Sequence, residues 1–170
     1  AVERLETYKP AWPLPKIFRM TKGGKLMEDI FEGATINTVS MLCIEDAVDA
    51  MEWGKSIGGL PAMQARADAN FKVLNDWVAK TDWVDFLAQV PETRSNTSVC
   101  LVIADAAIKL LDADAQAAFA KAIVSRLDKA GAAYDIGAYR DAPTGLRIWA
   151  GSTVEASSLA ALTEWLDWAF

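Results

Sequence analysis

Two apolar stripes with helical spacing, over residues 41–53 and 60–78, do most to limit how this chain can fold. In each stripe the apolar residues recur every three or four positions, which places them on one face of a helix. Gly58 and Gly59 separate the stripes, and Pro61 falls in the first turn of the second helix, where its missing N–H costs nothing. Each expected helix therefore has one apolar face that must pack against another layer.

The second half of the chain alternates short apolar runs with further helical patterns. Residues 97–103 are rich in β-branched side chains, which favours a strand, and residues 83–87 are a candidate partner strand. Asp112 is a suitable N-cap for a helix that Gly131 ends. We further expect strands over 133–136 and 146–150 and a last helix over 159–169. This order predicts an α+β fold (an α/β sandwich) in which helices cover a small, mostly antiparallel sheet.

Residues 1–36 show little periodicity and contain a cluster of prolines and the pair Gly23-Gly24. They are expected to form an extended arm with one short helix, ahead of a domain over residues 37–170. The segment 22–25 lacks the glycine-lysine-hydroxyl spacing of a phosphate loop, so we interpret it as a solvated turn. The arm also carries apolar residues that need a surface to cover them: Trp12, Leu14, Ile17 and Phe18.

Composition excludes several classes of function. The net charge of -6 and the lack of basic runs argue against a nucleic-acid-binding face. No segment reaches the roughly 18–20 apolar residues of a membrane span, and there is no secretory signal pattern, so we expect a cytoplasmic protein without a membrane partner. The chain has no histidine, which removes the usual base of a catalytic triad and most zinc sites, and no metal site is expected. Cys43 and Cys100 are expected to be buried thiols, and the tryptophans, Trp149 included, to lie mostly in the core.

Arg140 and Arg147 flank a turn that contains Pro143 and Gly145 and leads into the last expected strand. A guanidinium offers a rigid fork of donors that matches a carboxylate or a phosphate. The two arginines therefore suit a small substrate that carries both groups. Surface salt bridges to carboxylates such as Asp141 are the alternative.

Asn37 and Thr38 precede the first expected helix. By themselves they are typical of a polar cap, in which side-chain oxygens accept the N–H groups of the first turn. The N-terminal end of a helix also favours anions, so the pair is a second candidate for anion binding.

Three segments, residues 10–19, 32–43 and 139–149, together resemble the C-terminal part of bacterial phosphoserine aminotransferases. These are pyridoxal-phosphate enzymes of the aspartate-aminotransferase fold type (fold type I, class V), and the resemblance covers nearly the whole chain. It implies that residues 37–170 form the small C-terminal aminotransferase domain. It also implies that residues 1–36 are a remnant of the large-domain or insertion region.

The resemblance gives each candidate residue a role. Arg140 matches the arginine on the phosphate side of the substrate, and Arg147 matches the arginine that binds the substrate α-carboxylate. Asn37 and Thr38 match a pair that reaches across a dimer interface to the cofactor phosphate.

The reaction that the resemblance implies is reversible amino transfer from glutamate to 3-phosphohydroxypyruvate, giving phosphoserine and 2-oxoglutarate in L-serine biosynthesis. The family's Schiff-base lysine and the acidic partner of its pyridine nitrogen lie in the large domain and have no counterpart here. The chain alone is therefore expected to be inactive. It is expected to work as a homodimer or with a large-domain segment that holds most of the pyridoxal 5'-phosphate.

Two sequence differences keep other functions open. Tyr139 stands where many family members have histidine, and Val39 stands where they have proline. One alternative is a related aminotransferase with an unphosphorylated substrate. The other is a non-catalytic anion-binding or dimerisation module derived from the same fold.

Overall fold

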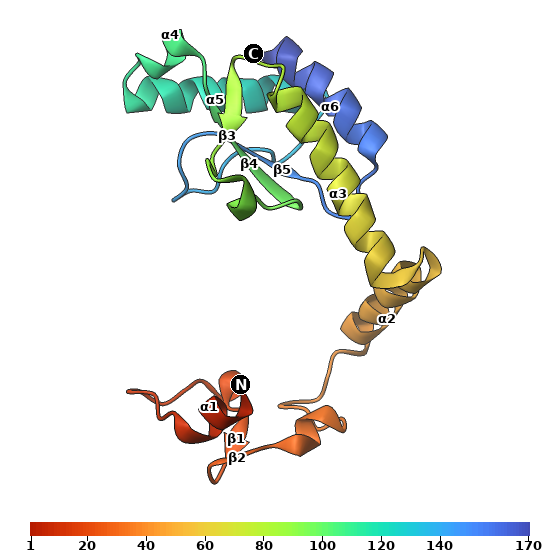
Figure 1. Ribbon diagram of the computed structural model, residues 1–170. Coiled ribbons are helices and arrows are strands. Elements are labelled where there is room, and N and C mark those ends of the chain that lie inside the picture. The colour runs from red at the N-terminus through yellow and green to blue at the C-terminus, as the bar shows by residue number, and fades with distance from the viewer. The chain divides into compact units, whose positions relative to one another are not determined.

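The computed structural model describes residues 1–170 as two compact units, Ala1–Trp53 and Gly54–Phe170. The second unit builds one sheet from β3 (Val84–Phe86), β4 (Ser98–Ile103) and β5 (Leu146–Trp149). Its helices are α3 (Gly59–Val78), α4 (Ala106–Lys109), α5 (Ala113–Lys129) and α6 (Ala156–Ala169), with a 3-10 turn at Pro91–Thr93. Figure 1 shows α3 and α6 side by side. The predicted α+β fold is confirmed.

The sheet is antiparallel, with β4 in the centre and β3 and β5 at its edges. Leu101 of β4 pairs with Phe86 on one side and with Leu146 on the other. All three are at most 4% exposed, because side chains alternate between the faces of a strand and these positions share the face that the helices cover. Cys100 and Arg147, which also pair in register, mark the opposite side of the sheet, which we call the far face.

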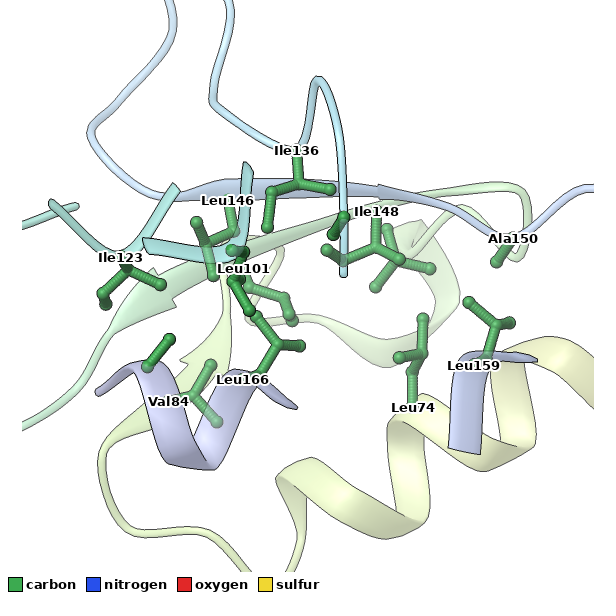
Figure 2. Packing of buried hydrophobic residues seen from close by; sticks show 14 of the residues in the cluster. Leu74, Val84, Leu101, Ile123, Ile136, Leu146, Ile148, Ala150, Leu159 and Leu166 are labelled. Carbon is green, nitrogen blue, oxygen red and sulfur yellow. The ribbon is translucent and has the colours of Figure 1, made fainter. Parts of the chain in front are cut away.

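The hydrophobic core lies between this sheet and helices α3, α5 and α6 (Figure 2). Leu74 of α3, Ile123 of α5 and Leu166 of α6 are each 0% exposed. Full burial of one such side chain stabilises a fold by about 1.5–3 kcal/mol. The apolar stripes predicted for these helices therefore form the core. None of the helices has the length and apolar character needed to span a membrane.

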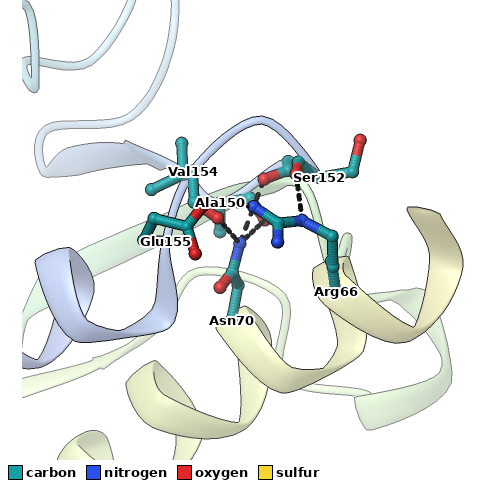
Figure 3. A network of polar contacts seen from close by, with 7 residues as sticks. Arg66, Asn70, Ala150, Ser152, Val154 and Glu155 are labelled. Atoms are coloured by element: carbon teal, nitrogen blue, oxygen red, sulfur yellow. Dashed lines mark hydrogen bonds and ion pairs between the residues drawn. The ribbon is translucent and has the colours of Figure 1, made fainter. Parts of the chain in front are cut away.

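One polar side chain, Asn70 of α3, is buried beside the core and fastens the loop between β5 and α6 (Figure 3). Its Nδ2 atom donates to the carbonyl oxygens of Ala150, Gly151 and Val154 at 3.1, 3.0 and 2.9 Å. Arg66, one turn earlier on α3, donates to the same loop. The loop that follows β5 is thus fixed to α3 by hydrogen bonds that leave the amide donor satisfied.

The first unit consists of short elements whose residues are all exposed or half-buried. They are α1 (Val2–Thr7), 3-10 turns at Lys16–Phe18 and Glu28–Phe31, the strands β1 (Thr21–Lys22) and β2 (Lys25–Leu26), and the start of α2 (Met41–Ser56). Gly23 and Gly24 join β1 to β2 with φ angles of 62° and 78°, the left-handed conformation that two-residue hairpin turns require. The turn predicted at 22–25 is confirmed, and the domain boundary between residues 36 and 37 stays a prediction.

Several expectations about local structure are wrong. The apolar stripe of α2 is not buried, since Leu42 and Met51 are 72% and 67% exposed. The tryptophans do not lie mostly in the core, because four of the seven are exposed: Trp12, Trp149, Trp165 and Trp168.

Residues 133–136 do not form a strand, because Asp135 has a φ of 53° that breaks the extended path, and only Gly137 forms a bridge to Leu146. Cys43 is exposed on α2 instead of buried. Both cysteines of the chain are free thiols.

Candidate functional site

The alternation of side chains along β5 decides where its arginine points. Leu146 and Ile148 are 2% and 1% exposed and face the helices. Arg147 and Trp149 therefore lie on the far face of the sheet. Trp149 is 53% exposed there, so the prediction that it lies in the core is wrong. The backbone of Arg147 is also fixed along the outer edge of β5, where the N–H of Arg147 donates to the carbonyl oxygen of Ile136 at 2.8 Å.

Asp135 and Tyr139 hold the guanidinium of Arg147. Its Nη2 atom donates to the Asp135 carboxylate oxygen Oδ2 at 3.2 Å and to the Asp135 carbonyl oxygen at 3.4 Å. Its Cζ atom lies over the Tyr139 ring, 4.3 Å from the centroid. The Arg147 side chain is only 14% exposed, whereas the Asp135 side chain is 92% exposed, so water reaches the ion pair from the Asp135 side.

One donor of Arg147 has no partner. The Nε atom is buried and makes no hydrogen bond, which costs free energy for a polar atom removed from water. Nε and Nη2 form one edge of the planar group, which we call the side edge, and a carboxylate that approaches it accepts from both atoms. The side edge therefore offers two-point binding to a carboxylate, with Nη2 bonded to Asp135 and Nε unused.

Arg140 lines a separate space. A cavity of about 570 Å³ lies between α5 and residues 137–145, and the exposed Arg140 is part of its wall. Lys121 and Ser125 face it from α5. Asp128 and Asp135 also line the cavity, so its two cations face two carboxylates. The guanidinium of Arg140 is the group in this wall that can bind an anion with a fork of donors.

Asp135 and Tyr139 connect the two arginines. Both residues line the cavity beside Arg140, and both contact the guanidinium of Arg147, which is not itself part of the cavity wall. The two arginines thus share neighbours but not a cavity.

Asn37 and Thr38 lie in the first unit, ahead of α2, and both are exposed. The helix is capped by Ser40 instead, whose hydroxyl accepts the N–H of Cys43 at 3.5 Å and whose carbonyl oxygen accepts that of Ile44 at 3.2 Å. The interpretation of the Asn-Thr pair as a simple helix cap is therefore wrong. The contact with the cofactor phosphate that the resemblance implies for the pair stays a prediction.

Asp135 is the site residue that the sequence did not indicate, because it falls inside a predicted strand. Aspartate and glycine both have low strand propensity, so the closeness of Asp135 and Gly137 is the signal that could have indicated a break in the strand. Aspartate is also one of the few residues that tolerate a positive φ. Neither signal points to Arg147 as the partner of its carboxylate.

No protein-family model matches the chain. Among curated proteins, the phosphoserine aminotransferases of Methanosarcina barkeri and Methanosarcina mazei are 51% and 50% identical to it over 170 residues. These alignments cover 100% of the chain and 43% of each relative. The chain thus spans less than half the length of the curated relatives that it matches.

Solved structures support the same fold. The phosphoserine aminotransferase from Bacillus circulans subsp. alkalophilus matches with a TM-score of 0.67 at 17% identity, over 83% of this chain and 36% of that protein. The pyridoxal-phosphate-bound enzyme from Trichomonas vaginalis matches with a TM-score of 0.66 at 19% identity, over 82% of this chain and 36% of that protein. Over its whole length the chain is therefore similar to part of the phosphoserine aminotransferases, and it shares the fold of that part.

Proposed function

We propose that the chain is the substrate-binding, C-terminal part of a phosphoserine aminotransferase, which exchanges an amino group between glutamate and 3-phosphohydroxypyruvate. The observation that carries the proposal is the side edge of Arg147, where the buried and unpaired Nε lies beside Nη2. Such an edge is complementary to a carboxylate, and every substrate of this reaction carries one. The 51% identity to a curated phosphoserine aminotransferase supports the assignment.

In this proposal Arg147 binds the α-carboxylate of each substrate, and Arg140 binds the phosphate of phosphoserine and 3-phosphohydroxypyruvate. The cavity of about 570 Å³ beside Arg140 falls in the size range of small-molecule sites. A guanidinium that is held in one orientation fixes the carboxylate and so the α-carbon next to it. This positioning is the contribution of the chain to catalysis, because amino transfer needs the reacting atoms in a defined geometry.

The proposed cofactor is pyridoxal 5'-phosphate, which supplies the electron sink that makes the bonds of the α-carbon reactive. Asn37 and Thr38 are the residues of this chain proposed to donate hydrogen bonds to its phosphate. Every lysine of the chain is exposed, whereas a lysine that binds this cofactor covalently is typically activated in a desolvated pocket. We therefore assign the covalent link to a lysine outside these residues.

The cofactor assignment is tested by intact mass. The chain is mixed with stoichiometric pyridoxal phosphate and reduced with borohydride. No single-site adduct is expected. A single-site adduct at low cofactor concentration would show that a lysine of this chain forms the link.

The reaction is tested with the complete, cofactor-loaded protein that contains this chain. Amino transfer from glutamate to 3-phosphohydroxypyruvate is compared with transfer to hydroxypyruvate, which lacks the phosphate. Preference for the phosphorylated acceptor is expected. An equal preference would favour an aminotransferase with an unphosphorylated substrate, and binding without turnover would favour the non-catalytic module. The homodimer and the cytoplasmic location remain predictions.

A further inference from the structure

The carboxylate of Asp135 accepts from a nitrogen of Arg147 that a substrate carboxylate also needs. It accepts from Nη2 at 3.2 Å, and Nη2 is one of the two donors on the side edge. We infer that Asp135 is an internal competitor, which holds the side edge while the site is empty and leaves it when a substrate carboxylate binds. The inference rests on the proposed function of Arg147 and adds a residue that sets how tightly carboxylates bind.

The contact between Asp135 and Arg147 is easily exchanged. The Asp135 side chain is 92% exposed. Its carboxylate accepts one hydrogen bond, from Nη2 of Arg147. An ion pair with one partner open to water contributes little to stability. The Asp135 side chain can therefore rotate into solvent without disturbing the packing of the core.

A substrate carboxylate binds the same edge more strongly than Asp135 does. It accepts from Nη2 and from Nε, and Nε has no hydrogen-bond partner while the site is empty. Two parallel charge-assisted hydrogen bonds are stronger than one, and pairing Nε removes the cost of a buried, unsatisfied donor. Because Nε is buried, the groups that cover it must move before a ligand reaches it.

The backbone at Asp135 allows the charge to be removed without a change of shape. Its φ of 53° lies in the left-handed region, which asparagine accepts as readily as aspartate. In the variant Asp135→Asn the carbonyl oxygen of residue 135 still accepts from Nη2, and Tyr139 still lies against the guanidinium. Arg147 therefore keeps its position, and the variant isolates the carboxylate charge.

The test uses the complete, cofactor-loaded protein and two constants. One is the KM for glutamate, and the other is the inhibition constant of glutarate, a dicarboxylate that has no amino group and cannot react. Asp135→Asn is expected to lower both constants by about 1.5- to 5-fold, the range for an exposed ion pair. The midpoint of unfolding is expected to stay unchanged. Structural damage would raise the two constants, so a decrease is not a result of damage.

Asp141→Asn is the matched control. Asp141 is exposed on the same turn and makes no hydrogen bond or ion pair with Arg147. The variant changes the net charge by the same amount, and both constants are expected to stay unchanged. Equal tightening in the two variants would assign the effect to net charge and overturn the inference.

Two further outcomes bear on the inference. Weaker glutarate binding in Asp135→Asn would make Asp135 a residue that positions Arg147, and an unchanged inhibition constant would remove its role altogether. The proposed function is tested separately by Arg147→Lys, which keeps the charge and removes the fork. If the KM for glutamate is unaffected by that variant, the carboxylate role of Arg147 fails whatever Asp135→Asn shows.

Discussion

The guanidinium of Arg147 lies over the ring of Tyr139, with 4.3 Å between its Cζ atom and the ring centroid. Tyr139 is 68% exposed, so this contact, and not the core, holds its ring in place. An aromatic face orients a planar cation as well as attracting it. The contact therefore helps to fix the plane in which Arg147 presents its donors.

Replacement of Tyr139 tests this contact. Tyr139→Ala is expected to raise the KM for glutamate by about 2- to 5-fold, since cation–π contacts at exposed sites contribute about 0.5–1 kcal/mol. Tyr139→Phe keeps the aromatic face and is the control, with an expected KM close to that of the unaltered protein. Steady-state kinetics of the three proteins decide the point. If the phenylalanine variant behaves like the alanine variant, the hydroxyl and not the ring face is the important group.

Loss of Arg147 is expected to slow both half-reactions, and loss of Arg140 mainly one of them. Arg147→Ala is expected to reduce kcat/KM for both glutamate and phosphoserine by about 30-fold or more, because loss of a buried charged donor costs about 2–5 kcal/mol. Arg140→Ala is expected to reduce it mainly for the phosphorylated pair, because only those substrates carry a second anionic group. Single-turnover measurements of each half-reaction separate the two. Equal losses for glutamate and phosphoserine with Arg140→Ala would contradict its assignment to the phosphate.

Gly145 is expected to tolerate no side chain. A Cβ atom at this position would lie 2.0 Å from the carbonyl oxygen of Leu101, so backbone must shift beside the first residue of β5. Gly145→Ala is expected to lower the free energy of unfolding by about 1–3 kcal/mol, as overpacking does elsewhere. Gly137→Ala is the matched control, since its Cβ would meet no atom closer than 3.9 Å. Chemical denaturation of both variants measures the difference, and equal stability would show that β5 can move to accommodate the methyl group.

Asn70 is expected to be a stability residue and not a binding residue. Asn70→Ala removes the donor that three carbonyl oxygens of the loop after β5 share, and each buried acceptor left unpaired costs about 1–3 kcal/mol. Glu155→Gln is the control, because it breaks only the exposed ion pair with Arg66 and is expected to change stability by about 1 kcal/mol or less. Thermal unfolding measures both. A similar loss in the two variants would mean that the buried amide contributes no more than a surface contact.

The long helices and the central strands could be predicted because the spacing of apolar residues encodes them. Leu74, Ile123 and Leu166 fall on the predicted stripes and are each 0% exposed. Helix α4 could not be predicted in this way, because a helix of 4 residues is too short to carry a stripe. It begins instead through Asp105, whose carboxylate accepts the first N–H groups of the helix.

The candidate site could be predicted only in part. Arg140 and Arg147 could be identified from their residue type and from the turn that they flank. The ion pair of Arg147 could not be predicted, because it depends on the left-handed backbone of Asp135 inside a segment with the sequence of a strand. The exposure of Trp149 could have been predicted from the alternation of side chains along the strand, because Leu146 and Ile148 face the core and Trp149 lies on the same face as Arg147. The prediction of a buried Trp149 considered only the size and apolar character of its side chain. Roles in ligand binding for Arg140, Arg147, Asn37 and Thr38 stay predictions.

Alternate positions of β5 are under different constraints. Leu146 and Ile148 can vary only within the volume that the surrounding side chains leave, because a change there alters the packing of the whole unit. Arg147 and Trp149 can be exchanged for residues of other chemistry while that packing is kept. A lineage that inherits this strand can therefore change the chemistry of its far face at two positions, while the other two preserve its ability to fold.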